Sequence, residues 1–65
     1  MEENILAIKD NDVYYGTKYI GSVCYKPQGH WTAYLATNTG DEVVGQYKTD
    51  VLAAEAVGEA AREGE

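Results

Sequence analysis

The chain has 65 residues and a formal net charge of −6, from 11 acidic and five basic side chains. This length suits one small domain near the lower limit for folding without disulfides or metals. The single cysteine and the single histidine exclude a disulfide framework and a cysteine–histidine zinc site. The acidic balance argues against non-specific attraction to nucleic acid or to an anionic membrane.

Cellular location is constrained by two features of the sequence. No apolar run approaches the roughly 20 residues that a membrane-spanning helix needs. The N-terminal Met-Glu-Glu-Asn is acidic, whereas an export signal would be basic. Because a free cysteine in an unexported chain fits a reducing compartment, we expect a cytoplasmic protein.

The segment ahead of the main sheet combines a short apolar run with a turn. Residues 5–9 are mostly apolar, residues 10–12 (Asp-Asn-Asp) favour a turn, and residues 13–15 (Val-Tyr-Tyr) have strand composition. Gly16 and Gly21 indicate a bend or a bulge. The segment therefore predicts a hairpin or a single strand.

Three strands are predicted next, over residues 19–26, 31–37 and 42–48, all rich in β-branched and aromatic side chains. The turns between them have suitable chemistry, Pro27-Gln28-Gly29-His30 and Asn38-Thr39-Gly40-Asp41. These segments are short and evenly spaced, which is typical of an antiparallel sheet.

Period-2 alternation in the middle strand divides its side chains between two faces of the sheet. The core-facing set is predicted to be Trp31, Ala33 and Leu35. The solvent-facing set is predicted to be Thr32, Tyr34 and Ala36. In the third strand, Gly45 predicts a bulge that lets Val44 and Tyr47 share the buried face.

A helix is predicted over residues 49–62. Thr49 is placed to accept a hydrogen bond from the first-turn amides, and Asp50 complements the positive end of the helix dipole. Gly58 is expected to weaken the helix by about 1 kcal/mol relative to alanine. The predicted apolar stripe consists of Leu52, Ala53, Ala56, Val57 and Ala60. An acidic stripe, most simply a solvated face, consists of Glu55, Glu59 and Glu63.

Together these elements predict an α+β fold with a three-stranded antiparallel sheet packed against one C-terminal helix. The sheet gains a fourth strand if the N-terminal segment joins it. Residues 1–65 form one small domain, in which 1–18 is the N-terminal strand or hairpin, 19–48 the three-stranded sheet and 49–62 the helix.

Several motifs of the predicted sheet and helix fit a known plan. The first turn and the start of the second strand read Lys26-Pro27-Gln28-Gly29-His30-Trp31, and Trp31-Thr32-Ala33-Tyr34-Leu35 reads aromatic-x-small-x-aliphatic. The run into the helix is Val44-Gly45-Gln46-Tyr47-Lys48-Thr49, and the helix holds Ala53-Ala54. This stretch resembles the ethylene-responsive-factor DNA-binding domain of plants and the arm-site-binding domain of tyrosine integrases, a plan shared by small phage and mobile-element proteins.

The resemblance implies that the helix covers one face of the sheet and that the opposite face binds DNA in the major groove. Carried over to this chain, the binding face comprises Cys24, Lys26, Gln28, Thr32, Tyr34, Asp41 and Val43, with Gly21 and Ala36 beside them. The chain departs from the family because this face carries no arginine and Lys26 is its only base. Since base reading and phosphate anchoring need several cations, a protein partner is expected ahead of duplex DNA.

Enzyme activity is not predicted. Cys24 has no second cysteine beside it, and His30 stands alone in a turn, so neither belongs to a recognisable catalytic or metal-binding set. No cofactor and no metal are expected.

The sequence therefore predicts a non-catalytic binding module, most simply a protein-binding adaptor or inhibitor of phage or mobile-element type. It would act through the exposed sheet face, where Tyr34 supplies contact area. DNA binding through the same sheet is the alternative function. Self-association through an exposed part of the small domain is the third.

Overall fold

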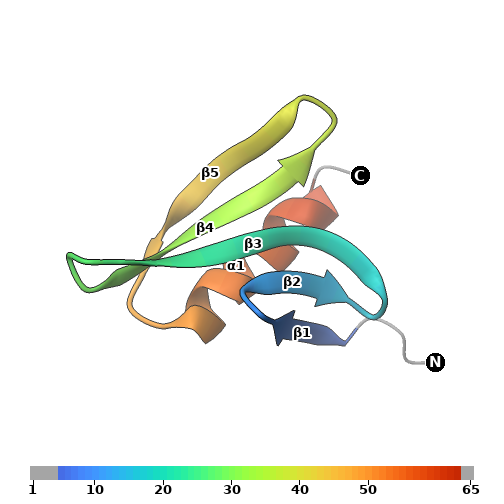
Figure 1. Cartoon of the computed structure of the whole chain (residues 1–65). Coiled ribbons are helices and arrows are strands. Elements are labelled where there is room, and N and C mark those ends of the chain that lie inside the picture. Colours follow the sequence, from blue (N-terminus) through green and yellow to red (C-terminus); the bar gives the residue numbers. More distant parts are fainter. Residues whose placement is uncertain (1–4, 64–65) are drawn as a thin grey trace.

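The computed structural model describes residues 5–63, so residues 1–4 and 64–65 of the predicted domain lie outside the described part. Its elements are β1 (Leu6–Lys9), β2 (Asp12–Tyr15), β3 (Lys18–Lys26), β4 (His30–Thr37), β5 (Gly40–Tyr47) and α1 (Asp50–Glu63). All strands pair antiparallel in chain order, and α1 packs on one face of the sheet (Figure 1). The α+β class with one C-terminal helix is confirmed.

The sheet has five strands, so the prediction of three or four strands was too low. The additional strands are β1 and β2, joined by Asp10 and Asn11, whose φ angles are 52° and 71°. Two consecutive residues with positive φ form the type of turn whose twist matches that of a hairpin. The turn was visible in the sequence, but each of its strands has only four residues, too few to indicate that both join the sheet.

Two strands of the sheet contain a bulge. The register between β2 and β3 shifts so that Ile20 is the extra residue beside Gly21, and the register between β4 and β5 makes Val44 the extra residue beside Gly45. Each bulge turns one more apolar side chain toward the helix, because Ile20 is buried and Val44 packs against the core. The predictions made from Gly21 and Gly45 are confirmed.

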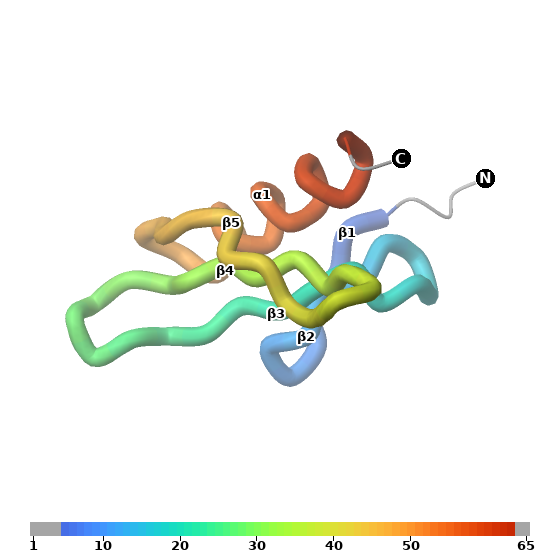
Figure 2. The backbone as a smooth tube through the Cα atoms, turned by 90° about the horizontal axis from the view of Figure 1, so that it is seen from above, coloured from blue at the N-terminus to red at the C-terminus, as the bar shows by residue number. Residues whose placement is uncertain are grey.

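The core lies between the sheet and α1. Its fully or almost fully buried apolar residues are Val13, Ile20, Val23, Ala33, Ala53, Ala54 and Val57. The predicted inward alternation of β4 is confirmed, because Ala33 is buried and Leu35 packs against it. Trp31 is only half-buried, however, because the β3–β4 hairpin extends beyond the body of the sheet (Figure 2).

The helix begins with the predicted cap, since the Leu52 N–H donates to Thr49 Oγ1 at 3.1 Å. Its buried stripe differs from the prediction. Leu52 is 46% exposed, whereas Ala54 and Gly58 are buried. Gly58 faces β1, and a Cβ at this position would lie 3.2 Å from Leu6 Cδ1. The missing side chain lets β1 approach the helix.

Candidate functional site

The candidate surface is the sheet face turned away from α1, and we call it the outer face. Figure 2 shows α1 on one side of the sheet, with no helix on the other side among the described residues. Because directly paired residues of antiparallel strands share a face, the register defines its members. The central part consists of Ser22, Cys24, Lys26, His30, Thr32, Tyr34, Ala36, Asp41, Val43 and Gln46.

The register brings most of the predicted site residues together on this face. Cys24 of β3 pairs with Thr32 of β4, and Tyr34 of β4 pairs with Val43 of β5. Asp41 pairs with Ala36 at the β4–β5 end of the face. The remaining predicted residue, Gln28, is exposed in the β3–β4 turn and so lies at the tip of the hairpin.

Lys26 reaches back across the middle of the outer face. Its Nζ lies 5.9 Å from the centre of the Tyr34 ring, a distance suited to a cation–π contact. Lys26 pairs with His30, four residues before Tyr34 on β4, so its side chain extends along the face past the Cys24–Thr32 pair. The lysine and the tyrosine therefore form one half-buried unit.

Two residues expected on the exposed face are not available there. Thr32 lies on the outer face but is only 4% exposed, and its Oγ1 has no hydrogen-bond partner among the described residues. It is covered because β4 lies between β3 and β5, so that Cys24 and Gln46 flank it on both sides. Gly21 faces the helix instead, since a Cβ there would lie 2.7 Å from Val57 Cγ1.

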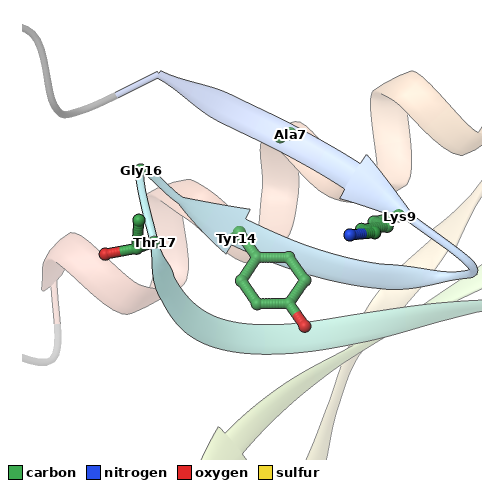
Figure 3. Close-up of a pocket in the computed structure, with 5 residues that line it drawn as sticks. All are labelled: Ala7, Lys9, Tyr14, Gly16 and Thr17. Carbon is green, nitrogen blue, oxygen red and sulfur yellow. The ribbon is translucent and has the colours of Figure 1, made fainter.

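A second aromatic group lies toward β1. The rings of Tyr14 and Tyr19 are 5.8 Å apart and inclined by 69°, an edge-to-face arrangement. Beside them is a shallow hollow of about 320 Å³ on the outer face (Figure 3). Its lining consists of Ala7, Lys9, Tyr14, Gly16 and Thr17.

The sequence left the orientation of the N-terminal tyrosines open. Tyr15 points to the helix side, where its ring carbons lie close to Gly58, whereas Tyr14 and Tyr19 point outward. Strand alternation alone predicts that Tyr14 and Tyr15 lie on opposite faces of the sheet. Only the tertiary register shows which of the two lies on the outer face, because the bulge at Ile20 resets the pairing of β3.

The charge of the outer face is mixed. Within the five strands, Lys9 and Lys26 stand against Asp12 and Asp41 on this face. A sheet face with tyrosines, one exposed valine and balanced charge lacks the cation density that nucleic-acid backbones require. The arrangement is chemically suited to contact with another protein surface.

Other chemistry has little support in residues 5–63. These residues contain no group of three or more histidine, cysteine, aspartate or glutamate side chains that could hold a metal ion, and the Cys24 thiol is free and exposed. The described part of the chain also has no helix long and apolar enough to cross a membrane. No protein-family model, curated protein or solved structure matches the chain.

Proposed function

We propose that this protein is a non-catalytic binding module that docks a protein partner through its outer face. The observation that carries the proposal is the gathering of Tyr14, Tyr19, Tyr34 and Val43 on a sheet face that no helix covers in the described structure. Tyrosine offers large contact area at low entropic cost and is enriched in protein interfaces.

The dimensions of the molecule are compatible with this role. The chain measures 38 × 24 × 18 Å, so its two longer dimensions bound a face of roughly 900 Å², close to the ~800 Å² that each partner contributes to a standard interface. A standard interface would therefore occupy most of the outer face.

Electrostatics favour a basic partner. Acidic residues flank the outer face, with Asp10 and Asp12 at the β1–β2 end and Asp41 at the start of β5. With a net charge of −6, these groups steer a positively charged surface toward the tyrosines. An adaptor or inhibitor of phage or mobile-element type, acting in the cytoplasm, is the concrete form of the proposal.

Affinity capture from a lysate of the source cells, with three variants and a nuclease arm, tests the proposal. Tyr34→Ala removes the central ring of the outer face, and Val43→Glu places a charge beside it. Tyr25→Ala is the matched control, because Tyr25 is 57% exposed but lies on the helix side of the sheet. We expect both outer-face variants to release a protein that the wild type and Tyr25→Ala retain.

Circular dichroism establishes that each variant is folded before capture is compared. A retained protein that Tyr34→Ala, Val43→Glu and Tyr25→Ala all release equally would contradict a specific role of the outer face. Material that disappears with nuclease treatment alone would contradict the protein-partner proposal and support nucleic acid as the ligand.

Duplex DNA binding through the same face is the second candidate function. It is favoured by the resemblance of β3, β4, β5 and α1 to a three-stranded DNA-binding plan, and Lys26 would be its main cation. Because so few cations are present, binding would weaken only slightly with added salt. Loss of duplex binding in Lys26→Ala and in Tyr34→Ala would support this function, whereas tight binding unaffected by either change would exclude it.

A further inference from the structure

The two edges of the sheet are unequal. β1 has four residues, whereas β5 has eight residues and pairs only with β4 among the described residues. A strand edge carries backbone N–H and C=O groups that pair readily with another strand. The β5 edge is therefore the longer template for strand addition.

The side chains of β5 follow a symmetric order. Pairing with β4 places Asp41, Val43 and Gln46 on the outer face, and Glu42, Gly45 and Tyr47 on the helix side. The bulge adds Val44 to the helix side, and Lys48 follows directly after the last residue of β5. From residue 42 to residue 47 the order reads inner, outer, inner, inner, outer, inner.

This order reads the same in both directions from the bond between Val44 and Gly45. It therefore fits pairing with a second copy of the same strand. An antiparallel second copy of β5, related by a two-fold axis at that bond, places every residue opposite one on the same face. Shifting the register by one residue sets outer side chains against inner ones, which a half-buried sheet does not tolerate. A two-fold interface of this kind is self-complementary.

The charges agree with the same register. The same register brings Asp41 of one copy to the end of the second copy's β5, where Lys48 follows Tyr47, and symmetry repeats this approach. Both residues are exposed in the single chain. Val43, which is 65% exposed, stands opposite Gln46 of the second copy. The facing strand positions therefore contain no like-charge pair, and each end of the interface brings one Asp41 near one Lys48.

We propose that β5 pairs antiparallel with β5 of a second copy of this chain, about an axis between Val44 and Gly45. The dimer has one continuous sheet, in which the two outer faces lie side by side. This inference concerns an edge rather than a face and requires no other protein, so it stands apart from the docking proposal.

Sedimentation of the full chain in 0.15 M salt tests the pairing. We expect a concentration-dependent monomer–dimer equilibrium. Asp41→Lys and Lys48→Asp each create two like-charge pairs, so each raises the dimer dissociation constant at least about tenfold. The double variant Asp41→Lys/Lys48→Asp restores both pairs with reversed sign and recovers the wild-type constant.

Glu59→Lys on the exposed side of α1 is the control, because it changes the net charge as Asp41→Lys does but leaves the edge intact. We expect it to dimerise at least as well as the wild type. A wild type that remains monomeric up to about 1 mM overturns the proposal. So does a dimer that both single charge reversals leave unchanged, or a folded double variant that remains monomeric.

Hydrogen exchange of the unmutated chain provides an independent measurement. Raising the protein concentration is expected to slow exchange of the β5 amides and to leave those of β1 unchanged. Equal slowing at both edges would contradict the β5 register. Neither measurement involves a docking partner, so failure of the dimer and failure of the proposed function are distinguishable.

Discussion

At the scale of single residues, two buried glycines have different packing roles. At Gly21, an added Cβ would collide with the Tyr34 carbonyl oxygen and approach Val57 Cγ1 to 2.7 Å. At Gly58, the nearest atom to an added Cβ is Leu6 Cδ1 at 3.2 Å, the end of a flexible side chain. The Leu6 side chain can move aside, whereas the backbone carbonyl of Tyr34 cannot. A glycine is therefore sterically required at position 21 but not at position 58.

We therefore expect Gly21→Ala to lower the free energy of unfolding by roughly 1–3 kcal/mol, as overpacking does. Gly58→Ala is expected to be close to neutral, because a helix-propensity gain of about 1 kcal/mol offsets the displacement of Leu6. Urea unfolding of the two variants measures both effects. Equal destabilisation by the two substitutions would contradict the packing described for the sheet–helix contact.

Trp31 gives a second prediction at this scale. Its ring meets Tyr25 edge-to-face at 5.3 Å, packs against the core and is half-buried. Trp31→Ala is expected to cost less than the roughly 3–5 kcal/mol typical of a fully buried aromatic residue, and the variant should remain folded. Thermal unfolding followed by circular dichroism measures the loss. A chain that fails to fold would show that Trp31 contributes more than its half-buried position indicates.

At the scale of elements, the helix cap is the clearest agreement between sequence and structure. Thr49 Oγ1 accepts from the Leu52 N–H, and Thr49 O accepts from the Ala53 N–H at 3.1 Å. Thr49→Ala removes the side-chain acceptor and is expected to cost about 1 kcal/mol, while Thr49→Ser retains it. A difference of about 4–8 °C between the two melting temperatures is expected. Identical melting of the two variants would contradict the cap.

At the scale of the whole molecule, the N-terminal hairpin belongs to the same packing unit as the rest of the sheet. Val13 of β2 and Val57 of α1 are both completely buried and belong to one cluster. Val13→Ala and Val57→Ala are each expected to cost roughly 2 kcal/mol, from two lost methyl equivalents and a residual cavity. Denaturant unfolding compares them. A much smaller loss for Val13→Ala would show that the hairpin is stabilised independently of the core.

The sequence by itself determined the local features of this protein. Thr49 and Asp50 predicted the start of α1, Gly45 predicted the bulge of β5, and alternation from Trp31 to Ala36 predicted the two faces of β4. Each of these depends on a few neighbouring residues, through capping, backbone conformation or side-chain period. Such signals are present before any long-range contact forms.

The tertiary structure decided what depends on contacts between distant segments. It added β1 and β2 to the sheet, rotated the helix so that Gly58 faces Leu6, and covered Thr32 on a face predicted to be open. It also placed β5 at the edge, where the symmetric order of its side chains becomes available to a second copy. Burial and register are properties of the packed sheet, because they depend on which segments, far apart in sequence, lie side by side.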